Sequence, residues 1–388
     1  MDSLTVLISP LSWGFGHAGR MIPLAMELQK RGAKIIFAAD APLLEMAGRE
    51  IPGITAVEIA GLRMRYSRLL PQYICIFLQL PHIIASAVRD HRTLRCLVSE
   101  YKPSVIISDN RFGFYNRSIF SVYVTHQLRI PFPRLLRFME PLAMWMHRII
   151  INRFDLCLVP DFPGSVNLSG RLSHGVRLTR NTIFCGPLSR FEIPGGTEPA
   201  IPDQGYPVCL LLSGPEPQST LLLERIADTL SGFSMVILSA TPLPLFMKET
   251  PPGIRVITTP DNPTMRKMLI SSSLVIARSG YSSVMELVSL GKGAVIIPTP
   301  GQPEQEYLGR HLNGRFGFIT MSQDNLEKLH EIAEERTPDH FPRRSGVNDA
   351  LFAGKHDSTG TAKTIENLPA AAPLLEKTID YLLEHKEK

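Results

Sequence analysis

The segment Arg278–Glu286 carries residue types that suit a nucleotide diphosphate and a ribose. Its sequence, Arg-Ser-Gly-Tyr-Ser-Ser-Val-Met-Glu, follows a strand-like run at 274–277 and opens a helical pattern, with Gly280 at the turn. Backbone amides at a helix start form a diphosphate site, and a carboxylate such as Glu286 accepts hydrogen bonds from ribose hydroxyls. The amides concerned are those of Tyr281, Ser282 and Ser283. Alternatively, the serines only cap the helix and Glu286 is solvated.

A second polar segment, Pro298–Tyr307, follows the next predicted strand at 294–297. Open α/β sheets bind ligands beyond the carboxyl ends of their strands, which is where this segment would lie. Amide and carboxylate groups suit the hydroxyls of a sugar. The side chains available are Gln302, Glu304, Gln305 and Glu306. The alternative interpretation is an ordinary charged helix start.

A glycine-rich turn, Gly14–Gly19, follows a predicted strand at 5–9 and precedes a helical pattern from about residue 19 to residue 31. Its glycines, Gly14, Gly16 and Gly19, match the dinucleotide fingerprint, and Asp40 lies near the end of the next strand. We do not favour NAD, because a pyrophosphate needs bare backbone at such a turn. Bulky side chains crowd it: Trp13, Phe15 and His17. A purely structural tight turn is the remaining alternative.

Two further polar residues, Asp109 and His126, follow the predicted strands 104–108 and 121–125. We expect both to face an acceptor site, although a structural polar role is equally compatible with the sequence. The chain lacks an Asp-x-Asp motif of the kind that holds a metal–diphosphate complex. The sequence therefore predicts a donor site without metal or cofactor, built from helix N-termini.

These residues are positioned by two similar patterns of apolar strands alternating with helices, which predict an α/β fold with two Rossmann-like domains facing each other across a cleft. In the second pattern the strands begin at 208, 235, 255, 274 and 294. The predicted divisions are an N-terminal acceptor domain at 1–191, a linker at 192–207, a C-terminal donor domain at 208–370 and a closing helix at 371–388. The linker is rich in Pro and Gly. Residues 339–363 are predicted to form a surface loop.

Composition points to a protein of the cytoplasm. We expect no signal peptide and no spanning helix, since the longest apolar stretch, 74–88, is interrupted by polar residues and proline. The five cysteines are scattered without metal-site spacing, which favours free thiols. Residues 61–155 hold thirteen arginines and one lysine against five acidic residues, a local net charge of +9. Anionic lipid or a phosphorylated acceptor suits this charge, whereas no nucleic-acid-binding module is visible.

The segment Pro133–Ile151 concentrates this combination of arginine and apolar residues. It contains Arg134, Arg137 and Arg148 among Leu135, Leu136, Phe138, Met139, Trp145 and Met146. As a helix it would lie at a membrane interface rather than cross the bilayer, which predicts a peripheral contact on the cytoplasmic face. A helix buried beside the cleft is the alternative.

The stretch from Arg278 to Tyr307 resembles the donor-binding region of family 28 glycosyltransferases. The strand-end Arg-Ser-Gly, the helix Glu286, the strand-end Pro298 and a Gln followed by Tyr align without a gap. The most similar type is the bacterial N-acetylglucosaminyltransferase that completes the lipid-linked peptidoglycan precursor. Weaker similarities are the loop ending in Gly16-His17, the cluster at 125–127 and the segment 185–188.

The resemblance implies a GT-B fold and an inverting transfer of a sugar, such as N-acetylglucosamine from its UDP derivative, to a lipid-linked acceptor of the cell envelope. It implies that Glu286 contacts ribose and that Gln305 contacts the donor sugar. At the family's second Gln this chain has Glu306, and its loop at Ser213-Gly214 continues with two prolines, which lack amide donors for phosphate.

For the reaction itself, His17 is the candidate general base, because imidazole titrates near neutrality. Two rivals use the same fold: a nucleotide-sugar hydrolase or epimerase, and a nucleotide-sugar sensor without catalysis. The basic, apolar region at 61–155 favours a lipid-linked or anionic acceptor over water.

Overall fold

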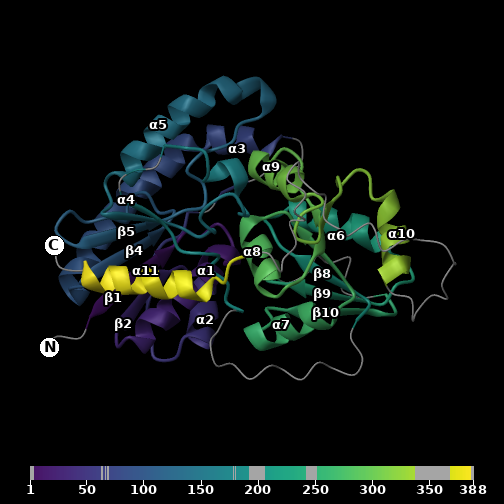
Figure 1. The fold of residues 1–388 in the computed structure, drawn as a ribbon, viewed down its shortest axis with the longest axis horizontal. Coiled ribbons are helices and arrows are strands. Elements are labelled where there is room, and N and C mark those ends of the chain that lie inside the picture. Colours follow the sequence, from purple (N-terminus) through teal and green to yellow (C-terminus); the bar gives the residue numbers. More distant parts are fainter. Residues whose placement is uncertain are drawn as a thin grey trace. The chain divides into compact units, whose positions relative to one another are not determined.

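The computed structural model describes residues 4–62, 64–65, 67, 70–177, 179, 181–191, 206–241, 251–336 and 368–385. It separates into two compact units, which we call the N-terminal and C-terminal units (Figure 1). The N-terminal unit comprises Met1–Arg65, Tyr73–Ile193 and Pro369–Lys388, and the C-terminal unit comprises Tyr66–Gln72 and Pro194–Leu368. The predicted surface loop at 339–363 and most of the predicted linker lie outside the described residues.

The described residues of the N-terminal unit form a seven-stranded parallel sheet in the order β3-β2-β1-β4-β5-β6-β7. The strands are β1 Thr5–Pro10, β2 Lys34–Ala39, β3 Thr55–Glu58, β4 Val105–Asp109, β5 Phe120–Val124, β6 Leu156–Val159 and β7 Thr182–Phe184. The central strands are buried along their whole length, as expected for a sheet covered on both faces.

The helices of the N-terminal unit are α1 Phe15–Lys30, α2 Ala41–Glu50, α3 Gln72–Leu78, α4 Leu80–Tyr101, α5 Glu140–Ile151 and α11 Ala372–Glu384, with short 3₁₀ turns η1 Arg134–Met139 and η2 Gly170–Leu172. Of these, helices α1, α2, α4 and α11 add buried apolar side chains to the cores on the two faces of this sheet. The C-terminal helix α11 lies along α1 (Figure 1) and adds Ile379 and Leu382 to the core around β1. The predicted closing helix is thus present, with Pro373 in its first turn.

The C-terminal unit repeats the plan with a six-stranded parallel sheet, again counted over its described residues, in the order β10-β9-β8-β11-β12-β13. The strands are β8 Val208–Leu212, β9 Met235–Ser239, β10 Ile254–Thr258, β11 Leu274–Arg278, β12 Ala294–Ile297 and β13 Phe318–Thr320. The helices are α6 Gln218–Thr229, α7 Asn262–Ser271, α8 Tyr281–Ser289, α9 Pro303–Leu312 and α10 Glu327–Arg336. Two parallel-sheet α/β domains confirm the predicted fold class.

In both sheets the strand order reverses direction next to the first strand, between β1 and β4 and between β8 and β11. Helices on the two sides of such a point diverge, so ligands bind there beyond the carboxyl ends of the strands.

All five cysteines are free thiols, as predicted; four are buried and Cys96 is exposed. The part of the chain that the structure describes contains no helix long and apolar enough to cross a membrane.

Candidate functional site

In the N-terminal unit, the turn after β1 lies at the point of strand reversal. β1 and β4 pair in parallel, with Pro10 opposite Asp109, so the loop after β1 and the carboxylate that ends β4 emerge together. The glycine-rich turn was expected to precede a helix starting near Gly19. The helix instead begins at Phe15, because Gly14 takes the N-cap with φ +112°, a backbone angle that favours glycine. Gly16, His17 and Gly19 therefore lie on α1 itself.

This early start turns His17 toward the end of β4. Nδ1 of His17 lies 2.9 Å from Oδ2 of Asp109, and the His17 side chain is 16% exposed. Arg20, one turn further along α1, donates from Nε to the same Oδ2 at 2.9 Å and from a terminal nitrogen to Oδ1. Asp109 is fully buried, and Arg20 is 2% exposed. A buried carboxylate is therefore held by one guanidinium and faces one imidazole.

His126, predicted at the same site, joins the network through Arg20. A terminal nitrogen of Arg20 lies 3.1 Å from Nδ1 of His126. Since a guanidinium has no acceptor, Nδ1 of His126 must be the acceptor, which places the proton of the neutral ring on Nε2. The structure thus brings together three of the predicted residues, His17, Asp109 and His126, and connects them by a fourth, Arg20.

The proton on His17 has two possible positions. Its Nδ1 lies 2.9 Å from the acceptor oxygen of Asp109 and also 2.9 Å from a donor nitrogen of Arg20. If Nδ1–H donates to Asp109, the lone pair lies on Nε2, at the opposite edge of the ring, and Nε2 can accept a proton. If Nδ1 accepts from Arg20 instead, Nε2 carries hydrogen. We assign the first arrangement, because a hydrogen bond to the buried carboxylate of Asp109 is charge-assisted and therefore the stronger of the two.

The charges around His17 favour its neutral form. Burial lowers the pKa of His17 below its usual 6.5, and the charge of Arg20 lowers it further, against the raising effect of Asp109. For Asp109, burial would raise the pKa of the carboxyl, but Arg20 and His17 outweigh burial and the pKa is lowered. At neutral pH the pair is therefore a carboxylate beside an uncharged imidazole.

Sequence reasoning missed Arg20, although it lies three residues after His17 and therefore on the same side of a helix. The helix had been expected to begin only near Gly19, which left no reason to link the two positions. It also missed the buried ion pair between Arg111 and Asp90, in which Arg111 additionally donates to Ser9 at the end of β1. Asp40, considered for NAD, instead accepts a hydrogen bond from Ser12 at 3.1 Å.

In the C-terminal unit, α8 begins directly after β11 with Gly280 as its N-cap. No side chain caps this helix, and its first backbone bond runs from the amide of Val284 to the carbonyl of Gly280 at 3.0 Å. Ser282 and Ser283 lie inside the first turn, so the serine-cap alternative is wrong. The amides of residues 281–283 precede that bond and point out of the helix start.

Glu286 is 7% exposed, so the alternative of a solvated carboxylate is also wrong. Gln305, on α9, is equally buried and accepts a hydrogen bond from the amide of Thr299 at 2.9 Å through its carboxamide oxygen. Its nitrogen lies 4.0 Å from the position that a Cβ on Gly280 would take. Glu306 accepts from the amide of Gly301 at 2.9 Å. The two strand-end segments thus adjoin, with the amide group of Gln305 beside the start of α8.

Arg278, which ends β11, is directed into the unit rather than toward a ligand. It donates to the backbone carbonyl of Gln218 at 2.7 Å and approaches those of Ile297 and Pro298 at 3.4 Å. Burial lowers the pKa of this guanidinium to about 9. Arg278 therefore joins the ends of β11 and β12 to the start of α6.

The loop after β8 carries the predicted Ser213 and Gly214, and Gly214 has φ +106° with open space around its Cα. The following Glu216 accepts hydrogen bonds from the hydroxyls of Ser219 at 2.5 Å and Thr220 at 2.7 Å, in the first turn of α6. A carboxylate thus occupies the positive end of α6, where it opposes a phosphate. Residues 213–214 remain predicted donor contacts, but the start of α6 has an acidic side chain beside it, whereas the first turn of α8 contains none.

Among the described residues, no group of three or more His, Cys, Asp or Glu side chains is arranged to hold a metal ion.

Comparison with known proteins supports a sugar-transferring enzyme. Residues 245–342 match the model of the glycosyltransferase family 28 C-terminal domain. An uncharacterized glycosyltransferase of Methanosarcina mazei is 24% identical over 363 residues, which cover 86% of this chain and 91% of the relative. The narrower similarity to the peptidoglycan type stays a prediction.

Solved structures share the fold. The glycotransferase of kitacinnamycin covers both chains fully with a TM-score of 0.61 at 16% identity. Spinosyn rhamnosyltransferase SpnG complexed with thymidine diphosphate has a TM-score of 0.56 at 16% identity and covers 99% of this chain and 100% of its own. A putative UDP-N-acetylglucosamine 2-epimerase from Listeria monocytogenes has a TM-score of 0.59 at 12% identity, covering 100% and 99%. Together these similarities support a glycosyltransferase with the two-domain GT-B fold, in which residues 245–342 are similar to the family 28 C-terminal domain.

Proposed function

We propose that the enzyme transfers a sugar from a UDP-linked donor to a hydroxyl of a lipid-linked or other anionic acceptor, with inversion and without metal. The N-terminal unit would take the acceptor and the C-terminal unit the donor. The observation that carries this proposal is the buried pair of His17 and Asp109, because it is a general base with a fixed orientation.

In this proposal Nε2 of His17 removes the proton of the acceptor hydroxyl. The hydroxyl oxygen then forms a bond to the anomeric carbon as the bond from that carbon to the diphosphate oxygen breaks. Asp109 stabilises the imidazolium that results, and Arg20 keeps Asp109 ionised. The leaving nucleoside diphosphate takes the electron pair, and its charge is stabilised by the amides that begin α8.

The donor contacts follow from the C-terminal unit. Glu286 would accept the ribose hydroxyls and Gln305 would donate to the sugar, while Gly280, Tyr281, Ser282, Ser283, Ser213 and Gly214 would contact the diphosphate. SpnG was solved with thymidine diphosphate in the same fold, which supports a nucleoside diphosphate as the ligand. Glu306 is held by the amide of Gly301, and it would contact the sugar through its second oxygen.

For the acceptor, the arginine-rich region at 61–155 supports an anionic, amphiphilic molecule and a peripheral contact with a membrane. Gly14, Gly16 and His126 would line the acceptor side, with Nε2–H of His126 as a donor near the acceptor's oxygens. Asp109, predicted to face the acceptor, is fully buried and would act only through His17.

The test is product analysis with a panel of UDP-sugars in the presence of EDTA, with and without a membrane lipid extract. We expect release of UDP only when extract is present, together with a new glycolipid detected by mass spectrometry. Equal release of UDP without extract would establish a hydrolase instead. The fold shared with a putative epimerase makes sugar epimerisation the second candidate, and NMR detection of an epimer without transfer would establish it.

A further inference from the structure

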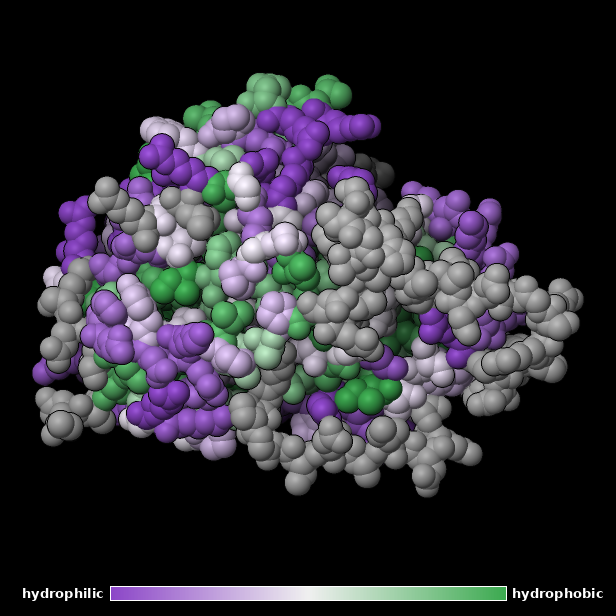
Figure 2. Space-filling view, viewed as in Figure 1, coloured by the Kyte–Doolittle hydropathy of each residue, from purple (hydrophilic) through white to green (hydrophobic). Residues whose placement is uncertain are grey.

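Helix α5 presents apolar side chains to solvent. Its buried residues are Glu140, His147 and Ile151, which form the inner face. The opposite face carries Leu142 at 55% exposure, Trp145 at 61%, Met146 at 52% and Ile149 at 41%, spaced three and four residues apart. The preceding η1 adds Leu135 and Phe138, the most exposed large apolar residues described. Figure 2 shows this hydrophobic group at the top of the view, over η1 and α5.

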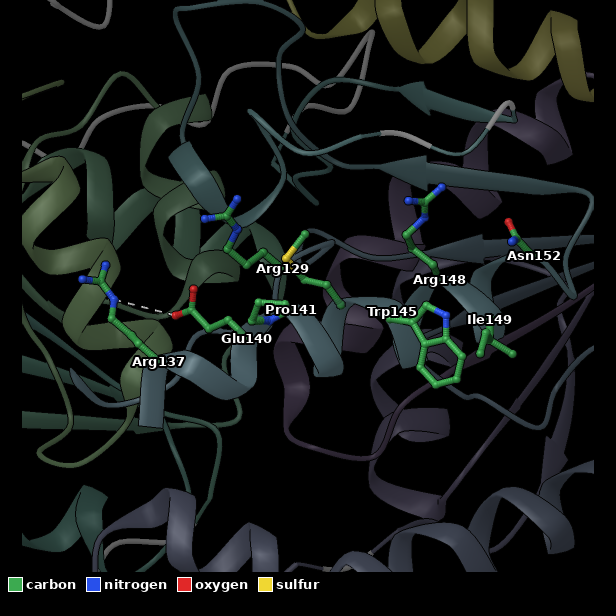
Figure 3. A pocket seen from close by; sticks show the side chains of 9 residues that line it. Arg129, Arg137, Glu140, Pro141, Trp145, Arg148, Ile149 and Asn152 are labelled. Carbon is green, nitrogen blue, oxygen red and sulfur yellow. Dashed lines mark ion pairs between the residues drawn. The ribbon is translucent and has the colours of Figure 1, made fainter. Parts of the chain in front are cut away.

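A cavity of about 720 Å³ opens along one flank of this helix (Figure 3). The residues of α5 that line it, from Glu140 to Ile149, are also three and four positions apart. Three lining side chains carry guanidinium groups: Arg129, Arg137 and Arg148. Trp145 and Ile149 belong both to the lining and to the exposed apolar face. The cavity is therefore polar and basic on one side and continuous with an apolar surface on the other.

The charges of the cavity do not cancel. Glu140 is its acidic lining residue, and this carboxylate already accepts from the amide of Phe132 at 3.3 Å. Arg137 lies 3.9 Å and Arg171 3.6 Å from the same oxygen. The lining therefore brings three guanidiniums against one carboxylate, and this excess of positive charge suits an anion.

We propose that this cavity binds the phosphate of an anionic phospholipid while the apolar face of α5 enters the bilayer interface. Arg129 and Arg148 would donate to the phosphate oxygens, and Trp145 would lie at the level of the glycerol backbone, as amphipathic aromatic rings do at membrane interfaces. The proposal rests on the peripheral membrane contact suggested above and gives it a site. It is separate from the proposed acceptor, since the lipid here is part of the bilayer and is not consumed.

The first test is flotation of the whole protein with phosphatidylcholine vesicles, with and without phosphatidylglycerol. Removing two phosphate donors in the double variant Arg129→Gln/Arg148→Gln should weaken binding to the anionic vesicles about 25-fold, at roughly fivefold per arginine. The control Arg49→Gln removes a charge from an exposed side chain of α2 in the same unit and should change binding less than about twofold. If vesicle affinity falls by the same factor per charge removed in both variants, binding is due to a diffuse basic surface and the proposed phosphate site is overturned.

Fluorescence gives a second readout, because the chain has only two tryptophans, Trp13 and Trp145. In a Trp13→Phe background the emission of Trp145 should shift to shorter wavelength with anionic vesicles, and soluble glycerol phosphate should not produce the shift. A shift with glycerol phosphate alone would overturn the lipid assignment in favour of a free phosphate ligand. If the wild-type protein shows neither flotation nor the emission shift, the membrane contact itself is overturned. The proposed reaction is tested separately, by measuring sugar transfer to a water-soluble acceptor.

Discussion

The two units present different chemistry at equivalent places in their sheets. At the end of β1 and β4 the N-terminal unit holds Arg20, Asp109 and His17 in a network of charged and titratable side chains. At the end of β11 the C-terminal unit offers backbone amides of α8, and Arg278 there is turned away onto carbonyl oxygens. At the point of strand reversal, the N-terminal unit thus carries titratable side chains on the helix after its first strand and at the end of β4, whereas the C-terminal unit carries a helix start after β11, the strand that corresponds to β4.

In the proposed function, this difference divides two tasks between two units of one architecture. Proton transfer needs a side chain whose pKa is set by its neighbours, and the pKa of His17 is lowered by burial and by Arg20 against the raising effect of Asp109. Binding a diphosphate needs donors without a competing negative charge. The start of α6, occupied by Glu216, fails this condition, whereas the first turn of α8 contains no acidic residue.

The largest expected effect comes from His17→Ala, which removes the proposed base. We expect kcat to fall by about 10²–10⁴-fold, while the donor dissociation constant changes by no more than a few fold because the donor contacts lie in the other unit. Steady-state kinetics with the acceptor varied and calorimetry with the donor measure the two. His330→Ala on α10, 46% exposed, is the matched control. A normal kcat with a raised KM for acceptor would mean that His17 only positions the acceptor.

A smaller effect is expected in the C-terminal unit from Glu286→Ala. Loss of the pair of ribose hydrogen bonds should cost about 1–3 kcal/mol, a roughly 5–150-fold weaker donor affinity. Calorimetry with a UDP-sugar in EDTA measures it. Because Glu286 is buried, Glu286→Gln tests the charge with little change in volume, and Glu331→Ala on the exposed side of α10 is the control. Unchanged affinity in both Glu286 variants would remove this residue from the donor site.

The smallest effect is on pH dependence. In the proposed mechanism neutral His17 is the active form, and burial together with the charge of Arg20 lowers its pKa below 6.5 against the raising effect of Asp109. The acid limb of kcat/KM should therefore have its midpoint below pH 6.5, with a flat profile from there toward neutrality. The residual rate of His17→Ala should lack this limb. A midpoint above 6.5 would show that Asp109 dominates the titration and that His17 is charged near neutrality.

Sequence patterns predicted the two α/β units because buried parallel strands are continuous apolar runs, as in 208–212 and 294–297. Short strands such as β3 and β7 were not predicted, since four or three half-exposed residues carry little pattern. The partnership of Arg20 with Asp109 spans 89 positions and exists only after the sheet forms. Likewise, Gln305 was predicted from its residue type, but its use of one oxygen to hold the amide of Thr299 depends on the turn at 298–302.

The way the chain returns to its first unit has a consequence for engineering. Helix α11 follows the C-terminal unit in sequence yet packs on α1, with Asp380 bonded to Arg31 at 2.6 Å and Ala371 lying 3.3 Å from the position of a Cβ on Gly186. Exchange of residues 194–368, the main part of the C-terminal unit, between related enzymes therefore requires two junctions, near 193 and near 368, rather than one. A chimaera made with a single crossover would pair α1 with a foreign C-terminal helix, and the complementarity of those two helices would limit which parents recombine.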